Sequence, residues 1–138
     1  MTRSLMRKIN EIFYSLQGEG FHTGTPAVFI RLSGCNLKCP FCDTQHEEGV
    51  LMTDEEIMAE VGKYPAMMVI LTGGEPSLWI DREFVDRLHQ MGKYVCIETN
   101  GTHELPDNID WVTCSPKRGA KLSISRMDEV KVVYESQD

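Results

Sequence analysis

Three cysteines lie within eight residues, at Cys35, Cys39 and Cys42, separated by three and then by two intervening residues. Thiolates are preferred ligands of soft metal ions, and iron–sulfur clusters are held by cysteine sulfurs. A structural zinc site or a cubane cluster usually takes four protein ligands, whereas this run supplies three. A [4Fe–4S] cluster on these cysteines would keep one iron open for a substrate or cosubstrate, much as a catalytic zinc ion keeps an open position.

A structural zinc site is the simplest alternative, because His46 lies close enough in the sequence to be a fourth ligand. That interpretation leaves the later stretch Gly73-Gly74-Glu75-Pro76 without a role. The other two cysteines, Cys96 and Cys114, stand in apolar runs, and we expect them to be buried packing residues. Thiolates clustered in this way, without a disulfide framework, indicate a reducing compartment and metal binding.

Length and charge narrow the class of protein. A chain of 138 residues is expected to form a single domain, residues 1–138. The formal net charge of −7 argues against a nucleic-acid partner, which would require a basic surface. No apolar run reaches the roughly 18 residues that a membrane-spanning helix needs. The first residues also lack the apolar core of a signal peptide, so we expect a cytoplasmic protein without a membrane segment.

Strand and helix patterns alternate along the chain, which predicts an α/β fold with a mostly parallel sheet. Apolar runs predict strands, and Thr53 and Asp81 are placed to cap the helices that begin there. A further short helix is expected within residues 122–128. The predicted strands cover residues 9–14, 27–32, 67–72, 94–99, 111–115 and 129–134.

Polar or glycine-rich residues follow four successive predicted strands. Because ligands bind at the carboxyl ends of strands in parallel α/β folds, we expect these residues to meet at one edge of the sheet. Their coincidence is hard to explain by packing alone. The four stretches are the cysteine run, Gly73-Gly74-Glu75-Pro76, Glu98-Thr99-Asn100-Gly101 and Ser115-Pro116-Lys117.

These motifs together resemble the radical S-adenosylmethionine superfamily, and Phe41 just before the last cysteine fits that pattern too. Within the superfamily the chain is similar to the 7-carboxy-7-deazaguanine synthase family of queuosine and 7-deazapurine biosynthesis. The finer resemblance is carried by residues 11–20 (EIFYSLQGEG), 29–37 (FIRLSGCNL), 42–44 (CDT) and 115–117 (SPK).

The resemblance implies an abridged partial (β/α) barrel of the radical SAM type. Family members continue past the strand predicted at 129–134, whereas this sequence stops at Ser136-Gln137-Asp138. The chain is therefore expected to be either an abridged member or one whose C-terminal part is missing. The apolar edge of the strand at 129–134 would then need cover, for which we expect a homodimer.

The resemblance also implies the chemistry. A [4Fe–4S] cluster on Cys35, Cys39 and Cys42 would bind the amino and carboxylate groups of S-adenosylmethionine at its open iron. One electron would break the sulfonium S–C5′ bond, and the resulting 5′-deoxyadenosyl radical would take a hydrogen from C6 of 6-carboxy-5,6,7,8-tetrahydropterin. Ring contraction with loss of ammonia would give 7-carboxy-7-deazaguanine, which makes the chain a carbon–nitrogen lyase. A flavodoxin-like electron donor is the family expectation.

The site residues are carried over from the family motifs. Those expected at S-adenosylmethionine are Phe41, Cys42, Asp43, Gly74, Ser115, Pro116 and Lys117. Glu98 is either a further contact to this cosubstrate or a structural carboxylate at a strand end. Those expected at the pterin are Leu16, Gln17, Gly18, Glu19, Arg31 and Thr72, with the Arg31 guanidinium pairing with the substrate carboxylate. The Thr44 hydroxyl would ligate Mg²⁺.

A different radical enzyme is the main alternative function. An activating enzyme for glycyl-radical enzymes would share the cluster and cosubstrate but take hydrogen from a protein glycine. Gln17-Gly18-Glu19-Gly20, Asp43-Thr44 and Ser115-Pro116-Lys117 favour the small-molecule reaction.

Overall fold

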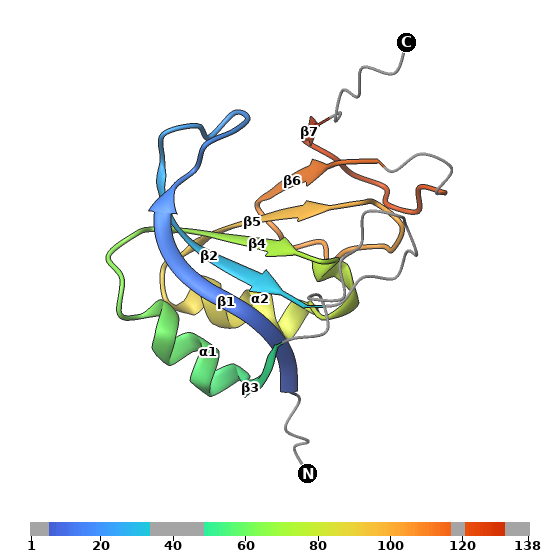
Figure 1. The fold of residues 1–138 in the computed structure, drawn as a ribbon. Coiled ribbons are helices and arrows are strands. Elements are labelled where there is room, and N and C mark those ends of the chain that lie inside the picture. Colours follow the sequence, from blue (N-terminus) through green and yellow to red (C-terminus); the bar gives the residue numbers. More distant parts are fainter. Residues whose placement is uncertain (1–5, 34–48, 117–120, 132–138) are drawn as a thin grey trace.

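The computed structural model describes residues 6–33, 49–116 and 121–131. Within these ranges one seven-stranded sheet runs in the order β3-β1-β2-β4-β5-β6-β7 (Figure 1). Strands β2, β4, β5, β6 and β7 are parallel, whereas β1 lies antiparallel to both β2 and β3. The predicted mostly parallel α/β fold is therefore confirmed. The strands are β1 (Met6–Leu16), β2 (Pro26–Leu32), β3 (Val50–Thr53), β4 (Met68–Gly73), β5 (Tyr94–Thr99), β6 (Trp111–Cys114) and β7 (Glu129–Val130).

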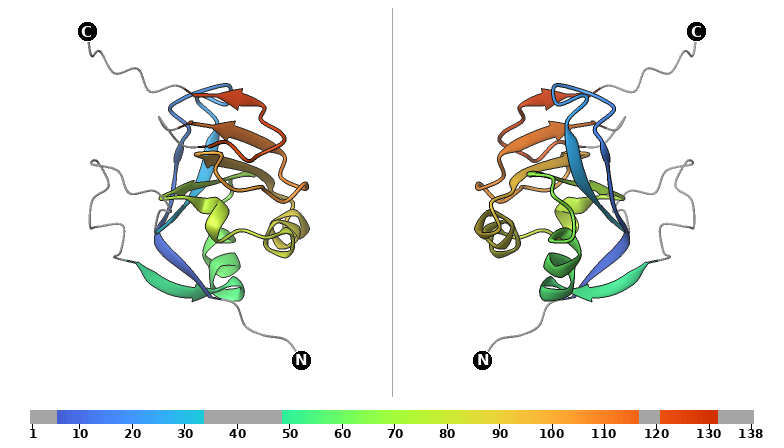
Figure 2. Two further views of the ribbon diagram at one scale, coloured as in Figure 1. Left: turned by 90° about the vertical axis from the view of Figure 1, so that its right-hand side faces the viewer. Right: turned by 90° about the vertical axis from the view of Figure 1, so that its left-hand side faces the viewer.

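Two helices cover one face of the sheet (Figure 2). They are α1 (Asp54–Val61) and α2 (Arg82–Gln90), and a 3₁₀ helix, η2 (Pro76–Leu78), precedes α2. None of the helices in the described ranges is long and apolar enough to cross a bilayer. The buried side chains that join helices to strands include Ile57, Phe84, Leu88, Val28, Ile30, Leu71 and Ile97. Full burial of such a side chain contributes about 1.5–3 kcal/mol.

Both helices begin where their capping residues predict. The Thr53 hydroxyl accepts the amide of Glu56 at 3.2 Å, and the Glu56 carboxylate accepts the amide of Thr53 at 2.8 Å. The Asp81 carboxylate accepts the amide of Phe84 at 2.9 Å. Each cap satisfies a backbone N–H that has no partner inside its helix, which fixes the first turn.

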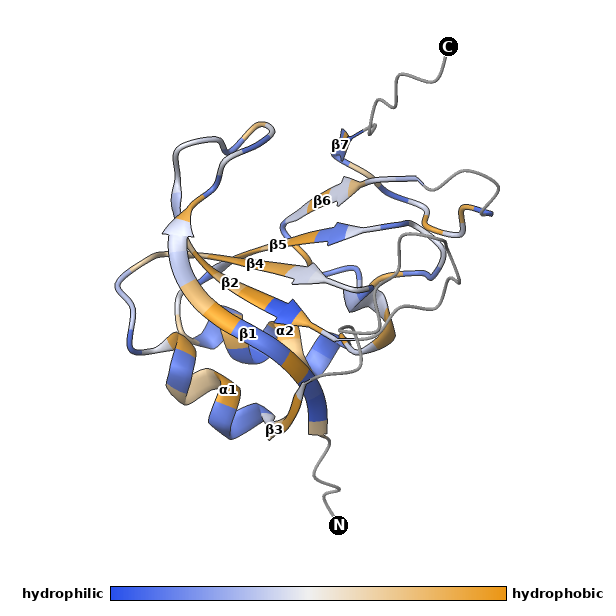
Figure 3. Cartoon of the chain, viewed as in Figure 1, coloured by the Kyte–Doolittle hydropathy of each residue, from blue (hydrophilic) through white to orange (hydrophobic). Residues whose placement is uncertain are grey.

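The other face of the sheet carries a smaller apolar cluster, formed by side chains that alternate with those of the main core. In the described part of the chain, neither α-helix packs on this cluster. Figure 3 shows that the apolar middles of β2 and β5 give way to polar carboxyl ends. The members of the cluster are Ala27, Phe29, Met68, Ile70 and Cys96, with Phe13 and Trp111 packed against them.

Three local features differ from the expectations. Strand β3 was not predicted; it pairs antiparallel with the first half of β1. The helix expected within 122–128 is wrong, because the amides of Ser123 and Asp128 bond to the carbonyls of Gly101 and Val112 instead of to a helical turn. The last predicted strand is seen as β7 over Glu129–Val130, and its continuation beyond residue 131 lies outside the described residues.

Candidate active site

A row of polar side chains crosses the face of the sheet that the helices leave open. Arg31 on β2 pairs in register with Glu11 on β1 and with Thr72 on β4. Thr113 on β6 pairs with Glu98 on β5 and with Glu129 on β7. The row crosses the strands near the carboxyl ends of the parallel ones, next to the apolar cluster. Such an edge is where ligands bind in parallel α/β folds.

Three of the predicted site residues meet through the Glu98 carboxylate. Thr72 Oγ1 donates to Glu98 Oε1 at 2.8 Å, and Gln17 Nε2 donates to Glu98 Oε2 at 3.3 Å. These residues come from β4, β5 and the loop between β1 and β2. Glu98 was expected either at the cosubstrate or as a structural carboxylate, and in the structure it accepts bonds from two residues that were expected at the pterin.

Arg31 projects from the same row, and its contacts with other described residues are weak. Its Nε lies 3.6 Å from Glu11 Oε1, and its guanidinium lies 5.7 Å from the centre of the Phe13 ring. Its side chain is 43% exposed. Exposed ion pairs of this kind contribute little to stability, so the guanidinium is available to bind an anion in two-pronged geometry.

The loop between β1 and β2 reaches across to the far edge of the sheet. The Glu129 carboxylate accepts the amide of Phe21 at 3.0 Å and also accepts bonds from Trp111 Nε1 and Thr113 Oγ1. A Cβ added at Gly20 would lie 2.5 Å from Glu129 Oε2. Gly20 has a φ of +78°, which favours glycine and lets the loop turn close to Glu129 on β7.

The loop and the strands enclose a cavity of about 240 Å³. Glu19 and Lys131 form an ion pair at its rim, and this bond raises the pKa of Lys131 above its ordinary value. The cavity is lined by polar residues above an apolar floor of Ile70, Cys96 and Trp111. Four of the polar lining residues are Gln17, Glu98, Thr113 and Glu129.

The backbone of the loop is only partly free to contact a ligand. The Gln17 amide donates to the Thr25 carbonyl at 2.9 Å, and the Gln17 carbonyl accepts the amide of Gly24. Of the predicted stretch Leu16 to Gly18, residue 17 thus offers its side chain, because both of its backbone groups already have partners in the hairpin.

Gly73, the last residue of β4, and Gly74 just after it lie against the end of β2. Gly73 has a φ of +112°, and a Cβ there would lie 2.3 Å from the Leu32 carbonyl oxygen. The Gly74 amide donates to the same carbonyl at 2.9 Å. Because this N–H is used, the group that Gly74 can offer the amino group of S-adenosylmethionine is its carbonyl oxygen.

Glu75 is a buried carboxylate at this edge of the sheet to which the sequence motifs assign no role of its own. It is 1% exposed. Its Oε1 accepts the amide of Asn100 at 2.7 Å, and its Oε2 accepts the amide of Ser77 at 3.1 Å and the hydroxyls of Ser77 and Thr99. The carboxylate thus ties the turn after β4 to the end of β5. Its place between Gly74 and Pro76 was the signal available in the sequence.

Some of the remaining predicted site residues lie within the described ranges, and the others lie outside them. The Ser115 amide donates to the Thr99 carbonyl at 2.7 Å, which places Ser115 and Pro116 beside the end of β5. The others lie outside the described residues: Cys35, Cys39, Phe41, Cys42, Asp43, Thr44 and Lys117.

The surroundings of the cysteine run fit an iron–sulfur cluster with its cosubstrate. The run follows β2 directly, and β2 ends at the carboxyl edge that carries the polar row. The glycine turn leaves backbone, not side chain, against the end of that strand. Among residues 6–33, 49–116 and 121–131, no three His, Cys, Asp or Glu side chains are grouped to hold a metal ion.

Cys96 and Cys114 are both buried, as predicted. Burial, with the negative charges of Asp110 and Glu98, raises the pKa of Cys96 to about 12.

At pH 8 the thiolate fraction of Cys96, and hence its rate of alkylation by iodoacetamide, should be roughly a thousandfold below that of the same residue in the urea-unfolded chain. Because this pKa is higher in the folded than in the unfolded protein, the free energy of unfolding is unaffected by this thiol's titration below about pH 9 and falls as the pH rises toward 12. Peptide mapping by mass spectrometry checks the rate, and equal labelling in both states would contradict it.

Comparison with known proteins agrees with this geometry. Residues 29–116 match the family described as the Radical SAM superfamily. The 7-carboxy-7-deazaguanine synthase of Bacteroides thetaiotaomicron is 81% identical over 134 residues, which cover 97% of this chain and 74% of that protein. The synthase of Nitratidesulfovibrio vulgaris is 42% identical, over 94% of this chain and 72% of the other.

A solved structure supports the same assignment. The crystal structure of QueE from Escherichia coli superposes with a TM-score of 0.82 at 34% identity, covering 92% of this chain and 70% of that one. The polar row, the glycine turn and the cysteine run therefore have a common explanation: this chain belongs to the radical SAM superfamily and, within it, to the 7-carboxy-7-deazaguanine synthase family.

Proposed function

We propose that this chain contracts the ring of 6-carboxy-5,6,7,8-tetrahydropterin to give 7-carboxy-7-deazaguanine with loss of ammonia. The observation that carries the proposal is the joining of Gln17, Thr72 and Glu98 in one hydrogen-bonded group, in the same row as Arg31. Donors, acceptors and a cation on one open face match a substrate that has a polar pterin edge and a carboxylate. The identity to named synthases supports the same reaction.

The family's cofactors are a [4Fe–4S] cluster and S-adenosylmethionine. Cys35, Cys39 and Cys42 would hold the cluster, and when bound the pair supplies the radical that starts the reaction. We assign the cosubstrate contacts to Phe41, Asp43, the Gly74 carbonyl, Ser115, Pro116 and Lys117. The single domain expected over residues 1–138 is supported by the one sheet that contains all the described strands.

The row of side chains would orient the substrate. Arg31 would pair with the pterin carboxylate, since its guanidinium projects from the open face and its Nε lies 3.6 Å from the Glu11 carboxylate, its ion-pair partner among the described residues. We now place Glu98 in this set, because a carboxylate fixed by Thr72 and Gln17 can accept hydrogen bonds from the pterin amino and ring N–H groups. Leu16, Gly18 and Glu19 would complete the contacts from the loop between β1 and β2.

Further partners are part of the proposal. Thr44 would ligate Mg²⁺ together with the substrate carboxylate, since hydroxyl and carboxylate oxygens are the ligands this ion prefers. A flavodoxin-like protein would deliver the electron. A homodimer would cover apolar side chains such as Val130, which is 54% exposed on β7, and sedimentation measures its formation. We expect these steps in the cytoplasm, where reducing conditions keep the cysteines as thiols.

Anaerobic reconstitution with iron and sulfide, followed by reduction and addition of both substrates, tests the proposal. Mass spectrometry should detect 7-carboxy-7-deazaguanine, at a lower rate when Mg²⁺ is withheld. The Cys39→Ala variant should give none, because it lacks one of the three predicted cluster ligands. Protein with an intact cluster that forms 5′-deoxyadenosine but no deazaguanine would overturn the substrate assignment and favour a glycyl-radical-enzyme activating enzyme. Colourless protein with bound zinc would favour the alternative of a structural zinc site on the cysteine run.

A further inference from the structure

The last described residue before the cysteine run is held by a tryptophan from a distant part of the chain. Trp79 follows η2, and its indole Nε1 donates to the Ser33 carbonyl at 2.8 Å. Ser33 is 1% exposed, and Cys35 lies two residues further along the chain. The indole N–H therefore fixes the backbone at the point where the run begins.

Other contacts place Ser33 beside Gly49, where the described part of the chain resumes after the run. The Ser33 amide donates to the Lys8 carbonyl at 2.9 Å. A Cβ added at Gly49 would lie 2.5 Å from Ser33 Oγ and 3.1 Å from the Ile9 carbonyl oxygen. Gly49 is the first described residue after the run, so the two described residues that flank the run, Ser33 and Gly49, lie side by side.

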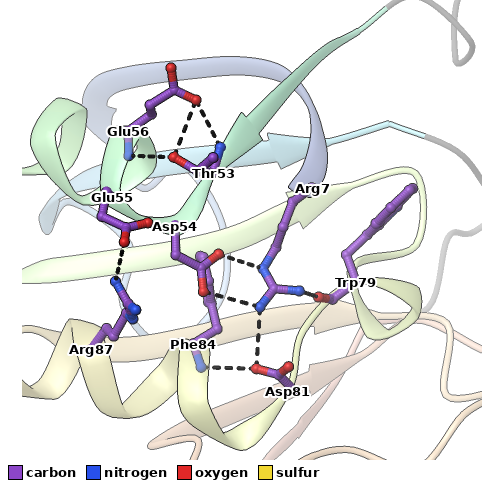
Figure 4. A network of polar contacts seen from close by, with 9 residues as sticks. All are labelled: Arg7, Thr53, Asp54, Glu55, Glu56, Trp79, Asp81, Phe84 and Arg87. Atoms are coloured by element: carbon purple, nitrogen blue, oxygen red, sulfur yellow. Dashed lines mark hydrogen bonds and ion pairs between the residues drawn. The ribbon is translucent and has the colours of Figure 1, made fainter. Parts of the chain in front are cut away.

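A buried arginine in turn holds Trp79 (Figure 4). Arg7 is 4% exposed, and its guanidinium donates to the Trp79 carbonyl. The same group donates to both carboxylate oxygens of Asp54, at 3.1 and 3.3 Å, and to Asp81 at 3.3 Å. It also lies 4.8 Å from the centre of the Phe84 ring. Separating a buried charge from its partners costs much free energy, so the Arg7 guanidinium holds the Trp79 backbone in a fixed position.

We infer that Trp79 is a positioning residue for the cluster, acting through the Ser33 carbonyl, and that Arg7 fixes Trp79 by joining it to the first turns of α1 and α2. Cys35 lies two residues beyond Ser33, and two residues of backbone span at most about 7 Å, so the position of Ser33 limits where Cys35 can lie. Three thiolates can share one cluster only at fixed separations, which makes the start of the run the sensitive point. The inference rests on the cluster ligands assigned in the proposed function.

The two tryptophans of the chain provide a matched test. Trp79→Phe keeps the apolar ring and removes one N–H donor. Trp111→Phe makes the same change at a bond to Glu129, on the last two strands of the sheet, β6 and β7. Loss of one hydrogen bond should speed iron release to a chelator about three- to tenfold in Trp79→Phe. Release from Trp111→Phe should stay within about twofold of the unchanged protein.

Absorbance near 400 nm follows the release and requires no turnover, so it separates this inference from the substrate assignment. Urea unfolding of the metal-free variants shows whether either substitution acts only through global stability. Unchanged release from Trp79→Phe, or equal acceleration by both variants, overturns the inference. An indole N–H of Trp79 that exchanges with solvent in the metal-free protein as fast as a free indole would also overturn it.

Discussion

Replacing Glu75 by glutamine is expected to lower the free energy of unfolding by at least about 2 kcal/mol. The carboxylate accepts the amide of Asn100 on one oxygen and the amide of Ser77 on the other. A glutamine side chain has one acceptor oxygen, so either rotamer turns an NH₂ group toward one of these two backbone donors. Hydrogen bonds to a buried charged group contribute about 1.5–3 kcal/mol, and no water can replace the lost acceptor cheaply.

Thermal unfolding of the metal-free protein measures the effect, and the midpoint should fall by roughly 6–12 °C. Glu104→Gln is the matched control, because Glu104 also accepts the amide and the hydroxyl of one serine, Ser125, but at an exposed position. That change should stay within about 0.5 kcal/mol. Equal midpoints for the two variants would show that Glu75 does not hold the turn after β4.

The Arg31→Lys variant is expected to raise the KM for the tetrahydropterin by roughly ten- to a hundredfold. Lysine keeps the positive charge but cannot form two parallel hydrogen bonds to a carboxylate. If Arg31 only attracted the substrate by charge, the substitution would change little. The dissociation constant of S-adenosylmethionine should not change, because Arg31 is assigned to the pterin alone.

Arg87→Lys is the matched control for this prediction. Arg87 lies on α2, on the covered face of the sheet, 3.9 Å from Glu55, and its replacement should leave both constants unchanged. Anaerobic calorimetry gives the affinity of each substrate separately from turnover. An Arg31→Lys enzyme with the original KM would remove Arg31 from the substrate site.

Much of the fold was predictable because its signals are local. The apolar runs of β2, β4 and β5 mark buried strands wherever they occur, and Thr53 and Asp81 carry their capping information within one helical turn. The failed helix within 122–128 shows the limit of such signals. There, the amides of Ser123 and Asp128 find acceptors on distant segments, and no local pattern specifies those partners.

The sequence motifs name candidate residues for the site but do not specify how those residues are arranged. Motifs name Gln17, Arg31 and Thr72 one by one. Glu98 remained ambiguous because its partner Gln17 lies 81 positions away. Glu129 gave no signal at all, since its contacts with Phe21 and Trp111 join residues 108 and 18 positions apart in the sequence.

The sequence by itself determined the chemistry: three cysteines at cluster spacing, a glycine turn and the strands that precede them. Residue type and spacing are properties of the chain, and they fix which ligands and which backbone conformations are available. Only the tertiary structure decided which residues these groups contact. Strand order and register placed Arg31, Thr72 and Glu98 in one row, and the buried Arg7 holds Trp79, whose indole donates to the Ser33 carbonyl. Contacts of this kind join residues far apart in sequence, so they exist only once the strands have paired and the helices have packed.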